Sequence, residues 1–124
     1  MYFKIVKDVD SKISDSVICI DGVFKLVAGD EIISVVRVSY RATHVDRLLS
    51  LYTIYTHPSY RRNRYATHLM THVINYFYTQ NKEYKLDYLD VRSYCSYYSE
   101  QNFCESFFKK FILHNANKNI SITY

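Results

Sequence analysis

The sequence contains few of the residues that mark several protein classes: no tryptophan, two glycines, one proline and three cysteines in 124 residues. The cysteines, Cys19, Cys95 and Cys104, are odd in number and widely spaced, which fits neither a disulfide framework nor a zinc site, so we expect reduced thiols and no bound metal. No apolar run approaches the roughly 20 residues of a membrane helix, and the N-terminal residues lack the apolar core of a secretory signal. These absences predict an intracellular, cytoplasmic protein with no membrane partner.

The overall composition is that of a folded domain. Hydrophobic residues make up 48% and charged residues 23% of the chain, and 124 residues suffice for one core, so we expect a single domain spanning residues 1–124. The net charge of +4 suits an anionic ligand such as a nucleotide phosphate, but it is too small to indicate nucleic-acid binding. The abundance of Tyr, Ile, Asn and Lys is typical of AT-rich coding sequences, which suggests a large viral or parasite genome as the source.

Two dipeptides that favour two-residue β-hairpins occur in the first third of the chain. Asp21-Gly22 and Gly29-Asp30 each lie between apolar runs, and their residues accept the positive φ angles that such turns need. Residues 17–40 are therefore predicted to form an antiparallel meander. Before them we expect a short strand at Tyr2–Val6, followed at Lys7–Ser16 by a loop or at most one helical turn.

The clearest predicted element is a helix at Tyr65–Gln80. Its apolar residues recur at helical spacing and form one face, which comprises Ala66, Leu69, Met70, Val73, Ile74 and Phe77. The helix follows a β-branched and aromatic run, LLSLYTIYT, that ends at His57-Pro58 because proline cannot continue a strand ladder. The later predicted elements are a strand at Lys85–Val91, a helix at Ser93–Gln101 ended by Asn102, a strand in preference to a helix at Phe103–His114, and a strand at Asn119–Tyr124.

A basic loop, YRRNRY, joins the strand to the helix. The first turn of a helix leaves backbone N–H groups unpaired and carries partial positive charge, which favours an anion. Arg61, Arg62 and Arg64 add charge-assisted donors suited to a diphosphate. Two interpretations are open: the loop binds phosphate, or the arginines only solvate the start of the helix. The Tyr/Arg alternation could also stack RNA bases, but a strand-to-helix junction fits a coenzyme phosphate better.

The stretch IYTHPSYRRNRYATHLM resembles the signature of the GNAT superfamily, in which an apolar strand and a proline turn precede an Arg/Gln-x-x-Gly-x-Gly/Ala loop and a leucine-rich helix. Thr56, Pro58 and Tyr60 match the lead-in, and Arg61 and Ala66 match the ends of the loop motif. In place of the middle glycine this sequence has Arg64. In the family this loop wraps the pyrophosphate of coenzyme A. The resemblance therefore implies acetyl-CoA as cofactor, bound by Tyr55, Thr56, Arg61, Arg62, Asn63, Arg64, Tyr65 and Ala66.

A second stretch, YCSYYSEQNF, resembles the fourth helix of the same family. Tyr97, Tyr98, Asn102 and Phe103 fall on matching positions, whereas Tyr94 and Glu100 depart from the pattern. The resemblance implies that Tyr98 is the catalytic acid that protonates the departing thiolate. The CSYY segment is also similar to the Cys-x-Tyr of compact members, which would place Cys95 near the acetyl group.

The resemblance implies an α/β (α+β) fold with a mixed, mostly antiparallel sheet, two main helices, and a splay between the strands at Leu51–Thr56 and Lys85–Val91. It implies an N-acetyltransferase that acts on a small-molecule or protein amine. His57, His44 and Asp90 are candidate bases. The alternative is a catalytically inactive GNAT-fold interaction module, with a protein partner or as a homodimer. This alternative is suggested by Arg64, by the strand's lack of a carboxylate, and by the short Lys7–Ser16 segment, which has no room for the helices that usually form the acceptor wall.

Overall fold

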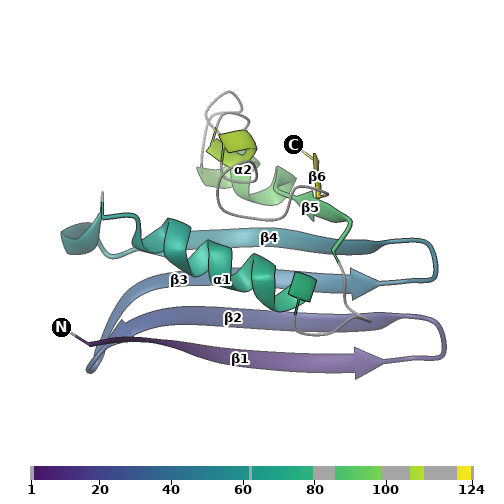
Figure 1. Ribbon diagram of the computed structural model, residues 1–124, viewed down its shortest axis with the longest axis horizontal. Helices are drawn as coiled ribbons and strands as arrows, with labels where there is room; N and C mark the ends of the chain where they lie inside the picture. Colours follow the sequence, from purple (N-terminus) through teal and green to yellow (C-terminus); the bar gives the residue numbers. More distant parts are fainter. Residues whose placement is uncertain (1, 62, 80–85, 99–106, 111–119, 124) are drawn as a thin grey trace.

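The computed structural model describes residues 2–61, 63–79, 86–98, 107–110 and 120–123. Within these residues, six strands form one sheet in the order β1-β2-β3-β4-β5-β6 (Figure 1). Neighbouring strands from β1 to β4 are antiparallel, whereas β5 runs parallel to β4 and β6 parallel to β5. The strands are β1 Phe3–Ile13, β2 Ile18–Ala28, β3 Glu31–Ala42, β4 Arg47–Thr56, β5 Tyr88–Asp90 and β6 Ser121–Thr123. This arrangement confirms the expected mixed, mostly antiparallel α/β fold.

The first hairpin differs from the prediction. β1 and β2 pair over 11 residues each, and the chain reverses where the Ser14 N–H donates to the Val17 carbonyl at 2.9 Å. The loop predicted at Lys7–Ser16 is therefore wrong for the part that lies in β1. That part appeared polar because β1 is an edge strand with many exposed side chains.

The predicted turn at Asp21-Gly22 is also wrong, because both residues lie inside β2. Glycine is needed there for packing: a Cβ atom on Gly22 would lie 2.9 Å from the ring of Phe24. The second predicted turn is confirmed. Gly29 has a φ angle of 59° between β2 and β3, in the left-handed region that glycine adopts without strain.

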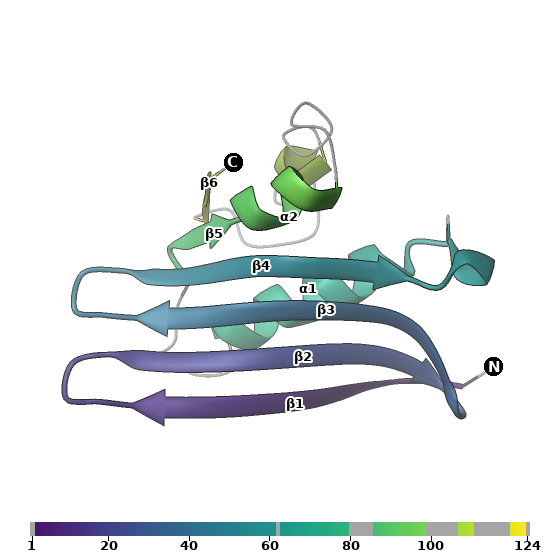
Figure 2. The ribbon, with the colours of Figure 1, turned by 180° about the vertical axis from the view of Figure 1, so that it is seen from behind.

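Helix α1 (Tyr65–Thr79) covers one face of the sheet, and no described helix crosses the opposite face of β1–β4 (Figures 1 and 2). The ring of Phe77 stacks on that of Tyr40 at a centroid distance of 4.9 Å and meets the edge of Phe24 at 6.1 Å. Burial of each large apolar side chain contributes about 1.5–3 kcal/mol. The predicted helix is thus confirmed together with its apolar face, of which Leu69, Met70, Val73, Ile74 and Phe77 are buried.

The C-terminal part is less regular than predicted. β5 is shorter than the expected strand, and helix α2 (Arg92–Tyr98) begins one residue before the expected helix. Residues 107–110 are helical, so the strand predicted at Phe103–His114 is wrong for this segment. Its fully buried Phe108 packs edge-on against Tyr94 of α2 at 6.1 Å. A short apolar run does not reveal by its periodicity whether it is a strand or a helix. The rest of that run and Asn102 lie outside the described residues.

The cysteines also differ from the prediction of reduced thiols. Cys19 is free, but Cys95 is disulfide-bonded, because spacing along a sequence does not report distance in the folded chain. Cys104 lies outside the described part. No helix in that part is long and apolar enough to cross a membrane.

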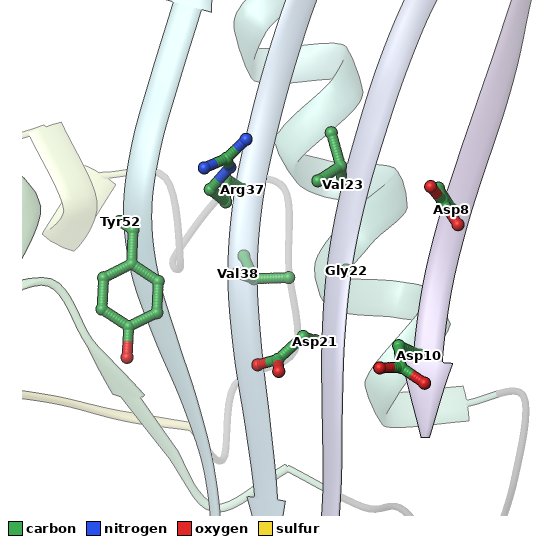
Figure 3. Close-up of a pocket in the computed structure, with 8 residues that line it drawn as sticks. All are labelled: Asp8, Asp10, Asp21, Gly22, Val23, Arg37, Val38 and Tyr52. Atoms are coloured by element: carbon green, nitrogen blue, oxygen red, sulfur yellow. The ribbon is translucent and has the colours of Figure 1, made fainter. Parts of the chain in front are cut away.

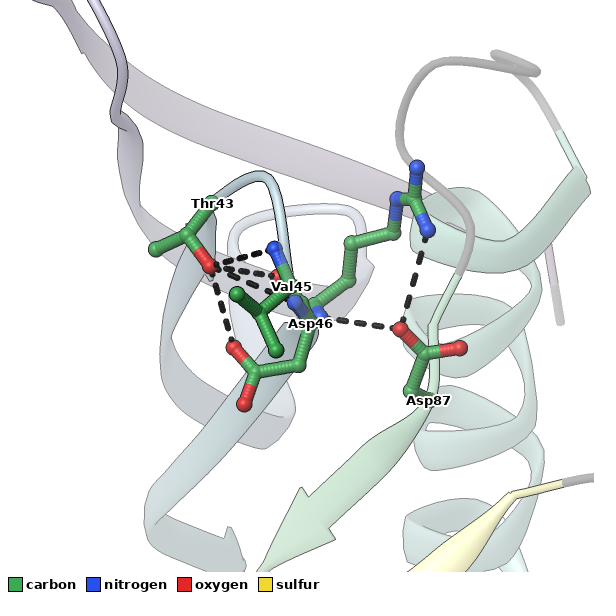
Figure 4. Close-up of polar contacts among 5 residues, drawn as sticks. Thr43, Val45, Asp46 and Asp87 are labelled. Atoms are coloured by element: carbon green, nitrogen blue, oxygen red, sulfur yellow. Dashed lines mark hydrogen bonds and ion pairs between the residues drawn. The ribbon is translucent and has the colours of Figure 1, made fainter.

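β4 and β5 are joined at one end only. Their pairing is limited to Leu48–Tyr88, Leu49–Leu89 and Ser50–Asp90. At the joined end, the Arg47 N–H donates to Asp87 Oδ2 at 3.0 Å (Figure 4). The Asp87 N–H in turn donates to the Arg47 carbonyl at 3.0 Å.

The turn before β4 reinforces this end. The hydroxyl oxygen of Thr43 accepts hydrogen bonds from the N–H groups of Val45 and Asp46, both at 3.2 Å (Figure 4). After Asp90 the chain turns into α2. No described strand therefore pairs with this edge of β4 from Leu51 to Thr56, which confirms the expected splay.

One histidine of α1 should make stability depend on pH. Burial lowers the pKa of His72 from the ordinary 6.5, and the charges of Lys7 and His68 lower it further. His72 therefore binds a proton more readily in the unfolded chain than in the folded one. For this reason the stability that is present above pH 6.5 is lost as the pH falls toward the lower pKa of His72 in the folded state. We expect the free energy of unfolding, measured in urea, to decrease less between about pH 7 and pH 5 in His72→Gln than in the wild type.

A control variant is His44→Gln, whose histidine is exposed in the turn between β3 and β4. It should keep the pH dependence of the wild type. An unchanged slope in His72→Gln would contradict the assignment.

Candidate functional site

A cavity of about 690 Å³ opens along the edge of β4 that faces β5, where no described strand pairs with β4 beyond Ser50. This volume lies within the range of sites that bind small molecules and cofactors. Segments far apart in the sequence meet there: the end of β4, the following loop, the first turn of α1, α2 and the helical segment 107–110. The lining residues are Thr53, Ile54, Tyr55, Thr56, Arg61, Ala66, Tyr94 and Phe107.

β4 approaches this cavity through a β-bulge. Arg37 of β3 pairs with Thr53, but the next residue pairs with Leu51, which leaves Tyr52 without a partner in the register of these two strands. A bulge bends a strand and changes the direction of its side chains, and bulges are frequent beside functional sites.

A buried hydroxyl fixes the cavity end of β4. Ser34 of β3 is fully buried, and its hydroxyl donates to the Tyr55 carbonyl at 2.7 Å. The same oxygen is in hydrogen-bond contact with Thr56 Oγ1 at 3.2 Å. In addition, the His57 N–H donates to the carbonyl of Ile33 at 2.8 Å. The predicted coenzyme-binding residues Tyr55 and Thr56 therefore have a firmly positioned backbone.

Polar contacts within the basic loop hold its shape. Arg61 Nε donates to the Thr56 carbonyl at 3.1 Å. The Asn63 side-chain amide donates to the carbonyls of Tyr60 and Arg61, at 3.3 Å and 3.2 Å. Arg61 and Asn63 thus have a structural role in addition to the predicted one. Arg62 lies outside the described residues.

Two tyrosines attach the loop to the sheet. The Tyr60 hydroxyl donates to the Glu31 carboxylate at the start of β3 at 2.7 Å, and this hydrogen bond raises the pKa of Tyr60. The ring of Tyr65 lies 5.1 Å from that of Phe3 and 6.1 Å from that of Tyr60. The side chain of Tyr65 therefore packs on the edge of the sheet.

Arg64 occupies the conformation that favours glycine. Its φ angle is 61°, the only positive value at a non-glycine position in the described part of the chain. Its carbonyl accepts the His68 N–H at 2.9 Å, so it directly precedes the first turn of α1. The first N–H groups of a helix have no acceptor within it, and this turn contains no acidic residue. The loop thus keeps a backbone suited to an anion although glycine is absent.

This conformation leads to a stability prediction. A non-glycine residue in the left-handed region costs about 1 kcal/mol or more. We expect Arg64→Gly to raise the free energy of unfolding by about 0.5–1 kcal/mol, measured by urea denaturation, because the relief of strain exceeds the entropy cost of glycine.

The matched control for this change is Arg64→Ala, which removes the charge but keeps the Cβ atom. It should give no such gain. Equal effects of the two substitutions would show that charge, not backbone strain, limits stability at this position.

The candidate bases are not grouped at the cavity. Asp90 forms two hydrogen bonds with the Arg92 guanidinium, at 3.0 Å and 2.8 Å, and this pairing lowers the pKa of Asp90, which makes it a weak base. His44 lies in the turn before β4, at the opposite end of that strand from the cavity. His57 lies at the cavity end, where its Nδ1 accepts the Ser59 N–H at 3.1 Å and caps the short 3-10 helix Pro58–Tyr60.

α2 brings the second predicted motif toward the same cavity. Tyr94 lines the cavity, and Tyr98 is the last residue of α2. The side chain of Tyr98 lies outside the described part. Cys95 is buried and disulfide-bonded, so it does not present a reactive thiol.

Sequence reasoning missed four of the lining residues: Thr53, Ile54, Tyr94 and Phe107. A signal for the first two exists in the strand, because Leu49 and Leu51 alternate but the next aliphatic residue is Ile54, one position late. This offset indicates a bulge. No comparable signal marks Tyr94 or Phe107, whose place depends on how the C-terminal helical segments fold back.

Comparison with known proteins agrees with this geometry. Residues 11–103 match the Acetyltransferase (GNAT) family, a range that contains β2 to β5, the basic loop, α1 and α2. Neither the curated proteins nor the solved structures gave a significant match. Because the family match covers most of the 124 residues and includes the cavity's strand, loop and helix, the chain belongs to the Acetyltransferase (GNAT) family.

Proposed function

We propose that this protein is an acetyl-CoA-dependent N-acetyltransferase that acylates an amine. The observation that carries the proposal is the 690 Å³ cavity at the open edge of β4, which adjoins the first turn of α1. Family membership supports the activity.

The residues at the cavity fit the chemistry of acetyl-CoA. The first-turn N–H groups at Tyr65 and Ala66, together with Arg61 and Arg64, provide donors for a pyrophosphate. We assign Arg62 and Asn63 to the same loop site. The unpaired backbone edge at Tyr55 and Thr56 can hydrogen-bond the amide groups of a pantetheine arm. Apolar surface for the arm comes from Ile54, Ala66, Tyr94 and Phe107.

When bound, acetyl-CoA supplies a thioester whose acyl carbon forms a bond to the amine nitrogen as its carbon–sulfur bond breaks. We assign to the Tyr98 hydroxyl the proton that the leaving sulfur takes, and the phenolate regains a proton from water. Backbone N–H groups at the edge of β4 orient the acyl oxygen. Ile54 and Phe107 reduce the access of water. Residues 51–56 contain no carboxylate, and we assign to water the proton that the acceptor ammonium loses before the neutral amine attacks.

One observation favours a second candidate, a catalytically inactive interaction module. Among the candidate bases, Asp90 is ion-paired and His44 is remote from the cavity. The conformation of Arg64 favours the enzyme instead, because its positive φ angle gives the loop backbone a form compatible with phosphate binding.

Calorimetry with acetyl-CoA separates the two candidates. An N-acetyltransferase should bind acetyl-CoA with one site per chain and release free coenzyme A thiol when amines are added. If the protein neither binds acetyl-CoA nor releases thiol with any amine tested, the enzymatic proposal is wrong and the interaction module is favoured.

A further inference from the structure

β1 is an edge strand that lacks most of the features that keep such strands from pairing with another chain. It is the first strand in the sheet order, and within the described residues only β2 pairs with it (Figures 1 and 2). It is 11 residues long, contains no proline, and keeps a continuous register with β2 from Phe3 to Ile13, without a bulge. Short length, proline and bulges usually protect an edge strand. The outer edge of β1 can therefore accept a further strand.

The turn of the first hairpin shows which backbone groups face this outer edge. The Ser14 N–H donates to the Val17 carbonyl, so these two residues form a hydrogen-bonded pair. In an antiparallel ladder, such pairs alternate with pairs whose N–H and C=O groups point away from the partner strand. Counted back from Ser14, the even-numbered residues of β1 bond to β2. The odd-numbered residues, from Phe3 to Ile13, thus offer a donor and an acceptor each to a further strand.

The two faces of β1 differ in their contacts. The ring of Phe3 packs on Tyr65 of α1, and the Lys7 ammonium lies 4.5 Å from the ring centre of Tyr76 of the same helix. Side chains alternate along a strand, so the even-numbered residues lie on the face away from α1, which we call the open face of β1. Figure 3 shows Asp8 on this face, where it lines a cavity of about 390 Å³.

The open face of β1 carries a self-complementary pattern. Lys4, Val6 and Asp8 are all exposed, and 42% of the Val6 surface is accessible. Neither Lys4 nor Asp8 forms an ion pair within the described part of the chain. The two opposite charges are equally far from Val6, on either side of it. A half-turn about an axis through Val6 therefore places Asp8 of a second copy opposite Lys4.

Charge selects one register for such a pair. A twofold axis perpendicular to the sheet makes the two β1 strands antiparallel, and residues opposite each other then lie on the same face. Like charges at opposed positions destabilise a ladder. Of the registers that pair at least seven of the 11 residues, all but one oppose like charges: Lys7 to Lys7, Asp8 to Asp8, Asp8 to Asp10, or Asp10 to Asp10. The remaining register opposes Val6 to Val6 and Lys4 to Asp8.

From these features we infer that the outer edge of β1 is a dimer interface between two copies of this chain. The two β1 strands pair antiparallel over residues 3–9 about a twofold axis at Val6, which joins the two sheets into one. The odd-numbered residues of this stretch exchange about eight main-chain hydrogen bonds. On either side of the axis, Lys4 of one copy lies opposite Asp8 of the other.

This interface is independent of the proposed function. β1 and β4 lie at opposite ends of the four-stranded antiparallel part of the sheet, and the 690 Å³ cavity opens at the edge of β4. Pairing through β1 therefore leaves that cavity accessible in both copies. The affinity for acetyl-CoA should be the same in the dimer and in a variant that is monomeric.

Sedimentation equilibrium over a range of protein concentrations tests the interface. Asp8→Lys should weaken dimerisation about tenfold or more, because it replaces two pairs of opposite charge by two pairs of like charge. Lys4→Asp/Asp8→Lys exchanges the two charges and should restore the affinity of the wild-type dimer. The matched control is Asp15→Lys, which makes the same charge change in the exposed turn after β1 and should leave the dimer unchanged.

Cross-linking tests the register. Val6 bonds to β2, so in the dimer it forms a non-hydrogen-bonded pair with its own copy, at a Cα separation of about 4.5 Å. A disulfide can span this separation. Val6→Cys should therefore give a disulfide-linked dimer under mild oxidation. Lys4→Cys, which lies opposite Asp8 and not opposite its own copy, should give none, and the wild type with its free Cys19 is the blank.

Three results would overturn the dimer interface. A protein that is monomeric at every concentration would leave the edge of β1 to a different partner. A dimer that Asp8→Lys does not weaken must use another surface, and a dimer that Val6→Cys does not cross-link must use another register. Failure of the wild type to bind acetyl-CoA would contradict the enzymatic proposal alone, because β1 pairing needs no coenzyme.

Discussion

Replacement of Tyr98 by phenylalanine should reduce kcat about 100-fold or more while the Kd for acetyl-CoA stays nearly unchanged. The substitution keeps the ring and removes only the hydroxyl that we assign as the proton donor to the leaving sulfur. The measurement is steady-state thiol release with a saturating amine, combined with calorimetry for affinity. The rate of thiol release reports a loss of proton transfer, whereas calorimetry reports a loss of affinity for the coenzyme.

Tyr97→Phe provides the matched control for this variant. Tyr97 is the preceding residue of α2, so the change deletes the same hydroxyl group from the neighbouring position. It should leave kcat within about twofold of the wild type if the effect is specific to position 98. Full turnover by Tyr98→Phe would eliminate the general-acid assignment.

Acetyl-CoA should bind about 10- to 100-fold more weakly to Arg61→Ala/Arg62→Ala than to the wild type, because charge-assisted hydrogen bonds to phosphate are among the stronger polar contacts. The salt dependence of the affinity should also decrease, since exposed charges are screened by salt. Titration calorimetry at two salt concentrations measures both effects. A control with the same charge change is Lys12→Ala/Arg41→Ala, whose residues are exposed near the far end of β1 and β3.

Arg61→Lys separates the charge of Arg61 from its hydrogen bond to the strand. Lysine keeps the positive charge but loses the Nε group that donates to the Thr56 carbonyl. An affinity between those of the wild type and the alanine variant would assign part of the effect to the shape of the loop. Unchanged affinity in the double alanine variant would contradict the assignment of the basic loop to the coenzyme.

The elements around the cavity at the edge of β4 could be predicted where a single local feature of the sequence determines the conformation. α1 was found from its apolar face, and the end of β4 from the proline at position 58. The splay between β4 and β5 followed from the family resemblance, and the pairing confirms it. The turn at Gly29 has a local cause as well, since its conformation requires no other part of the chain.

The failures occurred where distant residues decide the conformation. Asp21-Gly22 has the composition of a turn, yet Gly22 lies in β2, where it pairs with Val9 of β1 and Val38 of β3. Glycine is needed there because the ring of Phe24 occupies the space of a Cβ atom. Residues 107–110 form a helical segment that packs against α2. Their own sequence does not show whether the segment is a helix or a strand. The facing of Asp10 and Asp21 across the first hairpin could not be predicted either, because it depends on the β1–β2 register.

The extra residue in β4 has a consequence for how this chain tolerates length changes. Leu49, Leu51 and Ile54 all contribute to the core side because the bulge adds one residue between Leu51 and Ile54, so losing Tyr52 would restore strict alternation and leave Ile54 opposite Val36 of β3. A deletion at a regular position such as Ser50 would instead reverse the facing of the residues on one side of it. A deletion of one residue should therefore be tolerated better at the bulge than in the regular part of β4.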